Sequence, residues 1–308
     1  MRAERIAHPP NSFWSNSVVF TLVILGNGGR LGAAMARGYA GEARVIGFNH
    51  SQLDLASPQA IDDALGGLDF DTLINCAALI NVDYCETHPE EAFAVNARAV
   101  GQIAQLCARK HARCIHISTD YVFDGTQSTP YTETDPAHPL SVYGESKRQG
   151  EIECLAASAE HLAARVSWVF GPDRPSFLDQ ILQCARRGDS LQAIGDKWST
   201  PTYTLDLLEW LRPLLRDRAV GGLLHLASTG SCTWQEYGQW TLDCAIRTGL
   251  PLKSRTVAFQ SLSDLKAFVA RRPIHTTLDT GRFTALTGIT PRPWQESVEE
   301  YVREYHPG

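Results

Sequence analysis

The sequence predicts an α/β protein with a doubly wound parallel sheet and a second, smaller domain of mixed α+β structure. Two observations support this prediction. Apolar, β-branched runs alternate with helical segments through the first 170 residues, which is the pattern of buried strands joined by helical crossovers. A glycine-rich turn also joins the first of these runs directly to a helical segment. The alternation fades after Gly171, where segments shorten and prolines recur, so we place the smaller domain there.

Strands and helices can be assigned in chain order from composition and periodicity. The first strand is VVFTLVIL, residues 18–25, and the glycine turn after it leads into the helical segment AAMARGYA. Glu90 and Glu91, in the first turn of a long helical stretch, complement the helix dipole. The remaining expected strands are 43–48, 71–76, 113–118 and 162–169, and the remaining expected helices are 58–65, 88–110 and 140–157.

Composition is that of an ordinary globular protein and excludes several functions. The 308 residues, of which 44% are apolar and 20% charged, suffice for two compact units. The net charge of −6 lacks the basic excess that a general nucleic-acid binder needs, so we expect no nucleic-acid partner. No apolar run reaches the roughly 18 residues that span a membrane, so we expect no membrane association.

The cysteines and the N-terminal residues favour a cytoplasmic protein. None of the eight cysteines forms a C-x-x-C pair, and the simplest interpretation is that they are reduced, mostly structural thiols. The histidines show no metal-ligand spacing, so we predict no metal site. Residues 1–17 are polar, contain Pro9 and Pro10, and lack the apolar core of a signal peptide, so we expect a flexible extension there.

The turn after the first strand has the spacing G-x-x-G-x-x-G, formed by Gly26, Gly29 and Gly32. Such glycines permit a tight turn, let the backbone approach a pyrophosphate, and let the helix pack closely on the strand. The N-terminus of the following helix presents N–H groups to the phosphates. Because both the strand and the helix are in place, we interpret the turn as the dinucleotide site of a Rossmann-type domain; a plain strand–helix turn is the alternative.

The residues after the second strand bear on which dinucleotide binds. Dinucleotide-binding domains often place an acidic residue there to bond the ribose 2′-hydroxyl, whereas this chain has Asn49 and His50. Arg30, within the glycine turn, is placed to pair with a 2′-phosphate. We therefore expect NADPH as the cofactor, with NADH as the alternative; in the competing interpretation Arg30 is a solvated surface charge.

Tyr143 and Lys147 lie four residues apart on an expected helix, which places both side chains on one face. A nearby ammonium lowers the pKa of a tyrosine, which can then exchange a proton with a carbonyl or alcohol oxygen. Ser118 and Thr119 follow the fourth expected strand, at the edge where such sheets bind ligands. Together these residues predict a hydride-transfer site in which Tyr143 supplies the proton; a solvated helix face is the alternative for Tyr143 and Lys147.

Several blocks of sequence resemble the extended short-chain dehydrogenase/reductases and, within them, the dTDP-4-dehydrorhamnose reductase family. Besides the glycine turn and the tyrosine–lysine pair, they include STDYVFDG at 118–125, VDYCE at 82–86 and RVSWVFG at 165–171. The similarity covers about residues 20 to 300. It implies NADPH-dependent reduction of the C4 ketone of a nucleotide-sugar substrate, dTDP-4-dehydro-β-L-rhamnose, to dTDP-L-rhamnose.

The resemblance also implies roles for individual residues. Tyr143 is the implied proton donor, Lys147 orients the cofactor ribose, and Thr119 binds the C4 oxygen of the sugar. The expected substrate contacts are Val82, Thr119, Asp120, Trp168 and Arg272, and the expected cofactor contacts are Gly26, Gly29, Arg30, Leu31, Gly32, Asn49, Asp54, Leu55, Ala77, Ala78, Ile80, Tyr143 and Lys147. The expected domains are an NAD(P)-binding Rossmann domain over 18–170 and a mainly substrate-binding domain over 171–308, from which the chain can cross back to the first.

For several of these residues a purely structural role is the alternative. Trp168 also fits a position in the core, and Asp54 fits the cap of a helix. Arg272 could form a pair of surface charges with Arg271. His116, inside an expected strand, fits the core better than a catalytic role, and Asn96 fits a residue that only holds neighbouring backbone.

Departures from the family's pattern leave the exact substrate open. Thr200, the stretch 79–81 and Asn49 differ from the residues expected of relatives, and they fall near the expected cofactor and sugar. Two alternatives follow: a reductase of a different nucleotide-linked 4-keto sugar, and a non-catalytic, cofactor-binding regulatory subunit resembling the methionine adenosyltransferase β subunit. The sequence leaves the oligomeric state open, with a homodimer as the candidate.

Overall fold

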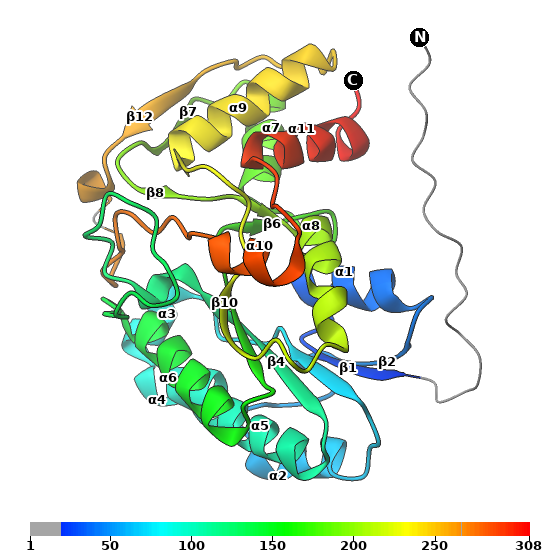
Figure 1. The fold of residues 1–308 in the computed structure, drawn as a ribbon. Coiled ribbons are helices and arrows are strands. Elements are labelled where there is room, and N and C mark those ends of the chain that lie inside the picture. The colour runs from blue at the N-terminus through cyan, green and yellow to red at the C-terminus, as the bar shows by residue number, and fades with distance from the viewer. Residues whose placement is uncertain (1–19, 266) are drawn as a thin grey trace.

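The computed structural model describes residues 20–265 and 267–308 of the chain. The expected extension over 1–17 and the first two residues of the expected first strand, Val18 and Val19, lie outside this part. Figure 1 shows two packed units, a sheet flanked by helices and, above it, a group of helices with short strand pairs.

The sheet has six parallel strands in the order β10-β5-β4-β3-β1-β2. The direction of winding reverses between β1 and β3, and ligands of such sheets bind at the carboxyl ends of the strands beside this point. The prediction of a doubly wound α/β fold is therefore confirmed. The strands are β1 Thr21–Leu25, β2 Arg44–Phe48, β3 Thr72–Asn75, β4 Arg113–Thr119, β5 Leu162–Val166 and β10 Gly222–His225, so that the sixth strand comes from beyond residue 170.

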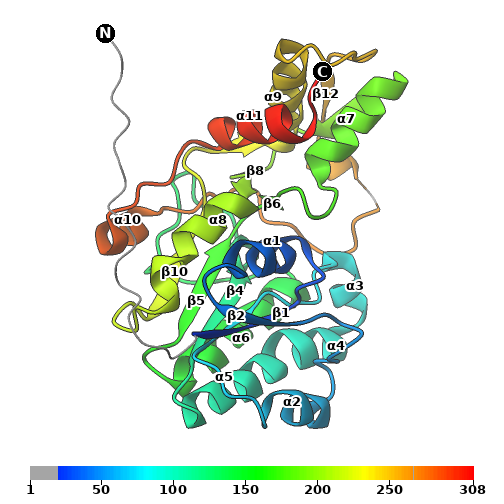
Figure 2. The ribbon, with the colours of Figure 1, turned by 90° about the vertical axis from the view of Figure 1, so that its right-hand side faces the viewer.

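Helices cover both faces of the sheet, as Figure 2 shows with the sheet nearly edge-on. On one face the side chains of α1, α8 and α10 join the sheet in one apolar core, and on the other α2, α5 and α6 form a second core. These helices are α1 Arg30–Tyr39, α8 Thr204–Leu211, α10 Gly281–Thr287, α2 Pro58–Leu65, α5 Ala99–Arg109 and α6 Val142–Ala157.

The second unit packs three helices, α7 Phe177–Arg187, α9 Trp234–Arg247 and α11 Trp294–Tyr305, around an aromatic-rich core of its own. Three two-stranded pairs lie beside them: β6 Val169–Phe170 with β9 Thr202–Tyr203, β7 Leu191–Ile194 with β12 Val257–Gln260, and β8 Trp198–Ser199 with β11 Cys232–Thr233. The short helices α3 Val82–Thr87, η2 Asp120–Val122, η3 Pro213–Leu215 and η4 Leu262–Asp264 complete the fold.

Two expected elements differ in the structure. The helix expected over 88–110 consists of α4 Pro89–Phe93, a π-helical turn η1 Ala94–Arg98, and α5. In that turn the Asn96 amide accepts from the backbone N–H of Leu79 at 2.8 Å and donates to its carbonyl at 3.0 Å, a long-range contact that helical periodicity does not reveal. The strand expected over 162–169 breaks at Trp168, whose φ of +37° is incompatible with an extended strand.

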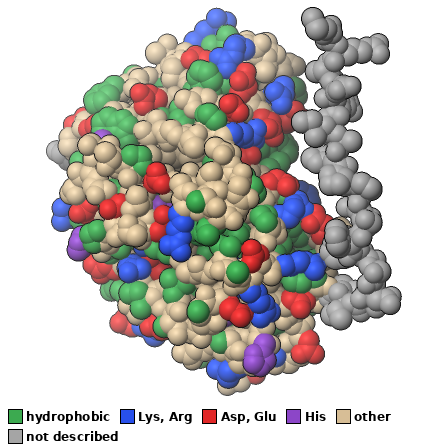
Figure 3. Space-filling model, in the orientation of Figure 1, with side chains coloured by type: hydrophobic (Ala, Val, Ile, Leu, Met, Phe, Trp, Pro, Cys, Tyr) green, Lys and Arg blue, Asp and Glu red, His purple; other side chains and the backbone are tan. Residues whose placement is uncertain are grey.

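Among the described residues, no helix combines the length and apolar character that crossing a membrane requires. The same residues contain no group of three or more His, Cys, Asp or Glu side chains that could hold a metal ion. Figure 3 shows acidic and basic side chains intermingled over the visible face.

A buried ion pair fixes α6 to the sheet. Arg165 on β5 donates through Nε and Nη2 to the two carboxylate oxygens of Glu151 on α6, both at 2.7 Å, and both side chains are at most 1% exposed. Ser118 on β4 donates to the same carboxylate at 2.6 Å, and Arg148 adds a contact at 2.9 Å. A buried charge without its partner is strongly destabilising, so this pairing sets where α6 can lie.

We predict that Glu151→Gln lowers the free energy of unfolding by about 3–5 kcal/mol, because it leaves the Arg165 guanidinium buried without its counter-charge. Urea denaturation measures the change. The control is Glu145→Gln on the same helix, whose side chain is exposed and which should change stability little. Equal losses in the two variants would contradict the prediction.

Candidate active site

The glycine turn has the close contacts that a dinucleotide cradle requires. Gly26 has a φ of +76°, and a Cβ there would lie 2.8 Å from the backbone nitrogen of Ala77. A Cβ on Gly32 would lie 2.2 Å from the carbonyl oxygen of Gly26, so α1 can approach the turn this closely only because residue 32 is glycine. The turn therefore brings the ends of β1 and β3 together at the switch point of the sheet.

The N-terminus of α1 fits a phosphate. Gly29 is the N-cap, no side chain of the described residues caps this helix by a hydrogen bond, and its first turn carries no acidic residue. The N–H groups of this turn and the helix dipole together favour an anion there. Because Leu31 is buried in the core beneath the turn, its contribution to a cofactor site is limited to its backbone.

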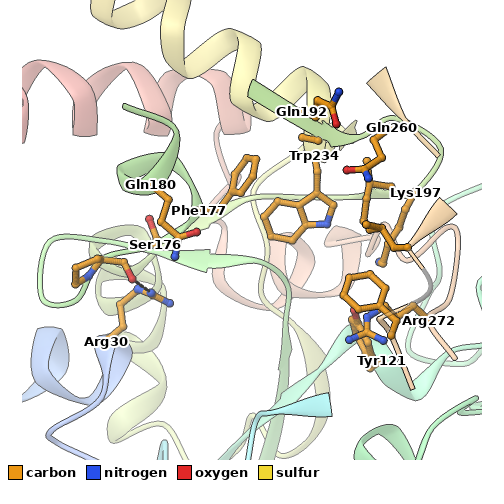
Figure 4. A pocket seen from close by; sticks show the side chains of 15 residues that line it. Arg30, Tyr121, Ser176, Phe177, Gln180, Gln192, Lys197, Trp234, Gln260 and Arg272 are labelled. Atoms are coloured by element: carbon orange, nitrogen blue, oxygen red, sulfur yellow. Dashed lines mark hydrogen bonds between the residues drawn. The ribbon is translucent and has the colours of Figure 1, made fainter. Parts of the chain in front are cut away.

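Arg30 has partners other than the expected 2′-phosphate. Its Nε donates to the carbonyl of Arg174 at 3.1 Å, its Nη1 to that of Val169 at 3.0 Å, and its Nη2 to that of Pro175. Figure 4 shows the Arg30 side chain at one side of a cavity, beside Ser176. The guanidinium thus ties α1 to the segment that enters the second unit.

Arg174 is a second arginine in contact with the glycine turn. Its Nε donates to the carbonyl of Gly28, and its Nη2 lies 3.9 Å from where a Cβ on Gly28 would be. The Cβ of Asn49, at the end of β2, lies 3.2 Å from the same point. The amide oxygen of Asn49 accepts from the backbone N–H and the hydroxyl of Ser51, at 3.0 and 2.7 Å. An exposed cation and an uncharged amide therefore flank the glycine turn.

The other expected cofactor contacts are distributed over two loops. Asp54 is exposed and accepts from the backbone N–H of Ala56 at 2.9 Å, while Ser57 is the residue that caps α2. Leu55 is buried in the core, so only its backbone faces the site. After β3, Ala77 and Ala78 are half-buried and Ile80 is 71% exposed.

Thr119 and Tyr143 bring two hydroxyl groups together at the end of β4. Tyr143, in the first turn of α6, is buried, and its phenol lies close enough to the Thr119 hydroxyl for that group to affect its pKa. Val82 packs in the small apolar cluster around Tyr143. Burial raises the pKa of Tyr143 above its ordinary value, with a smaller opposing effect from the Thr119 hydrogen bond. This direction is opposite to the lowering that we expected from Lys147, because the burial of the phenol is the dominant effect on its pKa.

Lys147 is fully buried behind Tyr143. Its Nζ donates to the carbonyl of Ile117 at 2.6 Å and lies 3.2 Å from Nε2 of His116. Burial lowers the pKa of Lys147 to about 8, and burial together with this ammonium holds the pKa of His116 well below its usual range. A neutral imidazole therefore faces Lys147 from β4, which makes His116 a buried partner of the lysine rather than a group that reaches substrate.

Asp120 is buried beside Thr119 and is fully engaged by hydroxyl groups. Thr119 donates to one carboxylate oxygen at 3.1 Å, and Ser199 and Thr276 donate to the other at 2.9 and 2.5 Å. Two of these hydroxyls belong to the second half of the chain. The carboxylate therefore connects the end of β4 to the second unit and orients the Thr119 side chain.

Trp168 lies where the chain leaves β5 for the second unit. Its ring stacks on Trp234 at a centroid separation of 4.1 Å, and its Nε1 is buried with no hydrogen-bond partner in the described part of the chain. Its φ of +37° is costly for a bulky residue and persists only where the surroundings enforce it. The strained backbone of Trp168 and the unpaired N–H of its ring favour a contact with a ligand over a purely structural position in the core.

Arg272 belongs to a polar clamp at the edge of the cavity. Its Nη1 and Nη2 donate to the two carboxylate oxygens of Asp83 on α3, at 3.0 and 2.7 Å. Asp83 also accepts from the backbone N–H groups of Val269 and Ala270, at 2.8 and 2.9 Å. These bonds lower the pKa of Asp83 to about 2, the Arg272 contribution being the largest. The expected substrate residue Arg272 thus holds the 268–273 segment against α3.

The cavity between the two units has a volume of about 470 Å³. In Figure 4, Lys197, Tyr121 and Arg272 lie on one side, Arg30 and Ser176 on the other, and Phe177 and Trp234 between them. Sequence reasoning missed Lys197, Arg174 and the Asp83 clamp. The VDYCE block pointed to the segment that contains Asp83, but no local pattern marks the other two, because each acquires its position from residues distant in the chain.

Comparison with known proteins agrees with this geometry. The family model described as the RmlD substrate binding domain matches residues 20–306. The chain is 31% identical over 291 residues to the dTDP-4-dehydrorhamnose reductase of Aggregatibacter actinomycetemcomitans, with 92% of this chain and 98% of that one covered.

Solved structures give the same result for the fold. The crystal structure of a dTDP-4-dehydrorhamnose reductase from Clostridium acetobutylicum has a TM-score of 0.85 at 28% identity and covers 92% of this chain and 99% of its own. The reductase of Bacillus anthracis in complex with NADP has a TM-score of 0.87 at 24% identity and covers 93% of this chain and 100% of its own.

Fold and site together define a reductase of the extended short-chain type, with a dinucleotide-binding sheet and a tyrosine–lysine pair at its carboxyl edge. The matching family model and the relatives then make the assignment specific. The chain belongs to the dTDP-4-dehydrorhamnose reductase family.

We predict that Asp83→Asn speeds amide hydrogen exchange at Val269 and Ala270, since the variant loses the charge that holds both N–H groups and Arg272. Hydrogen-exchange mass spectrometry of peptides from this segment measures the effect. The control is Asp63→Asn, whose exposed side chain bonds only Gln59 among the contacts found here.

The protection of Val269 and Ala270 from hydrogen exchange should change with pH in one direction. Because the pKa of Asp83 is depressed to about 2 in the folded protein, its stabilising effect on these bonds is fully present above the unfolded-state pKa of about 3.9. It is lost as the pH falls through the folded-state pKa. Unchanged exchange in Asp83→Asn at neutral pH would contradict the clamp.

Proposed function

We propose that this protein reduces the C4 ketone of dTDP-4-dehydro-β-L-rhamnose to dTDP-L-rhamnose, with NADPH as the preferred cofactor and NADH as a weaker one. The observation that carries the proposal is the meeting of Thr119, Tyr143 and Lys147 beside the glycine turn, at the carboxyl edge of the sheet. Family membership and the likeness to an NADP-bound reductase support the choice of substrate and cofactor.

The residues of the turn suit a pyridine dinucleotide. The tight approach of Gly26 to Ala77 and the uncapped N-terminus of α1 provide a cradle for its pyrophosphate. Arg174 and Asn49 would face its adenosine ribose, where no acidic side chain opposes a 2′-phosphate. When bound there, the nicotinamide supplies the hydride that reduces C4.

Tyr143 would supply the proton. Its raised pKa keeps the phenol protonated at neutral pH, which is the form that reduction of a ketone requires. As negative charge develops on the C4 oxygen, the phenol transfers its proton there. The Thr119 hydroxyl has one proton, which it donates to Asp120 in the structure, so it would turn from that carboxylate to donate to the C4 oxygen when the sugar binds.

Lys147 would bind the cofactor ribose. An ammonium has three N–H donors, and the Ile117 carbonyl accepts one of them. The remaining donors would be available to a ribose hydroxyl. Because the lysine is buried, its charge also stabilises any negative charge on Tyr143 during the transfer.

Two further predictions concern the protein's surroundings. We propose a cytoplasmic location, which is supported by the eight cysteines, all of them free thiols in the structure. We also propose a homodimer, which sedimentation of the purified protein tests directly.

We predict that Tyr143→Phe lowers kcat about 100-fold or more, because the variant cannot donate the proton. The assay follows NADPH oxidation with enzymatically generated dTDP-4-dehydro-β-L-rhamnose. Cofactor affinity, measured by titration, should remain, which separates loss of chemistry from loss of binding.

The control for this variant is Tyr84→Phe, which removes an exposed phenol that bonds Glu91 at 2.8 Å and should leave turnover unchanged. Full turnover in Tyr143→Phe would reject it as the proton donor. Wild-type protein that binds NADPH but oxidises none would favour a different 4-keto sugar or a non-catalytic subunit.

We predict that Asn49→Asp raises the KM for NADPH about tenfold or more while sparing NADH, because a carboxylate there repels the 2′-phosphate and accepts from a 2′-hydroxyl. The ratio of kcat/KM for the two cofactors is the measurement. Asn49→Ser keeps an acceptor for the Ser51 N–H without adding charge, and it should retain the wild-type ratio. The same shift in both variants would show that charge is not the cause.

A further inference from the structure

Lys197 is a buried cation in the wall of the cavity. It immediately precedes β8, its side chain is 1% exposed, and its Nζ makes no hydrogen bond with any described residue. The ammonium lies 5.1 Å from the ring centroid of Tyr121 and 5.4 Å from that of Trp168. Figure 4 shows it on the wall of the cavity between the two units, close to Tyr121.

This arrangement is unfavourable for the protein alone. A buried ammonium requires hydrogen-bond acceptors, and the faces of two aromatic rings replace them only in part. The nearest carboxylate, Asp120, already accepts from three hydroxyl groups. Nothing in the packing around Lys197 therefore explains why a charge is kept there.

The other cations that line the cavity are already engaged. Arg30 donates to three backbone carbonyls, and Arg272 forms its two-point contact with Asp83. Among the described residues of the lining, Lys197 is thus the cation whose donors remain for a ligand.

The position of Lys197 places that ligand beside the reacting sugar. The ring of Tyr121 meets the ring of Tyr143 edge-on at a centroid separation of 5.7 Å, so one aromatic ring separates the ammonium from the proton donor. The ring of Trp168 also lies near the ammonium, and its Nε1 is a second donor without a partner among the described residues. An oxygen-rich, negatively charged group in the cavity is the ligand that suits an unpaired ammonium in its wall.

We propose that Lys197 is a substrate-binding residue whose ammonium binds an anionic oxygen of the nucleotide sugar. The inference rests on the proposed function, which supplies a substrate of this class. The diphosphate, which every nucleotide sugar carries, offers this oxygen; a carboxylate on the sugar ring, which dTDP-4-dehydro-β-L-rhamnose lacks, is the second source that the test distinguishes. The ammonium would then be paired only in the complex, so the residue serves affinity rather than folding.

The pKa values of Lys197 and Tyr121 agree with this role. Burial lowers the pKa of Lys197 to about 8; the charge of Asp120 acts upward and that of Arg272 downward. Tyr121 packs against it as a neutral phenol, since burial raises its pKa. A bound anion raises the pKa of Lys197, so binding at a pH above 8 should take up a proton.

The test compares wild-type protein with Lys197→Met, which keeps the length of the side chain and removes the charge. Isothermal titration calorimetry measures the affinity for dTDP, dTDP-glucose and dTDP-glucuronate, in two buffers of different ionisation enthalpy to count protons. Lys253→Met, at an exposed position, is the matched control and should bind all three ligands as wild type does.

Loss of affinity in Lys197→Met supports the inference, and its pattern identifies the oxygen. A loss of about tenfold or more for all three ligands indicates the diphosphate, and a loss confined to dTDP-glucuronate indicates a sugar carboxylate. Proton uptake above pH 8 should disappear in the same variant. Wild-type affinity for all three ligands in Lys197→Met would overturn the inference and leave the proposed function standing, whereas wild-type protein that binds none of them would overturn both.

Thermal unfolding separates binding from a structural role. If Lys197 serves the ligand, Lys197→Met should leave the midpoint temperature of the ligand-free protein unchanged or higher, because an unpaired buried charge is replaced by an apolar chain of similar volume. A marked fall in that temperature, together with equal fractional loss of all binding, would assign the lysine to folding and overturn the inference.

Discussion

The buried Glu151–Arg165 ion pair determines where the catalytic helix lies. It joins α6 to β5, and Ser118 joins the same carboxylate to β4, so three elements share one buried charge pair. Tyr143 and Lys147 are carried on α6, and Thr119 directly follows Ser118. The relative placement of Thr119 and Tyr143 therefore depends on a charge pair that lies outside the candidate site, where water cannot compete for it.

Two carboxylates extend this frame to the second unit. Asp120 accepts hydroxyl groups from β8 and from Thr276, and Asp83 holds Arg272 and two backbone N–H groups. Each accepts from donors that lie at least 79 residues later in the chain. The cavity lies between the segments that these two carboxylates hold together. The distance between its two sides is therefore fixed, although the residues of the two units pack into separate apolar cores.

Sequence reasoning succeeded where local rules decide the structure. The buried strands, the glycine turn and the spacing of Tyr143 and Lys147 depend on periodicity and on backbone sterics, and the structure has all of them. It failed where distant residues decide. The partners of Arg30, the raised pKa of Tyr143 and the burial of Lys197 each arise from chain segments brought together only by the complete fold. Helical periodicity likewise cannot show the π-helical turn that Asn96 requires.

The unpaired ammonium of Lys197 stands out because the buried carboxylates of the frame are well paired. Asp120, Glu151 and Asp83 each accept from several donors, which shows that the fold can supply partners for buried charged groups. Lys197, by contrast, lines the cavity with its Nζ unpaired among the described residues, 5.4 Å from the ring centroid of Trp168, whose Nε1 is also unpaired. Packing alone would replace such donors with apolar side chains at little cost, as buried polar groups without partners reduce stability. Their presence together, beside a strained backbone at Trp168, is therefore best explained by a ligand that supplies the missing oxygens.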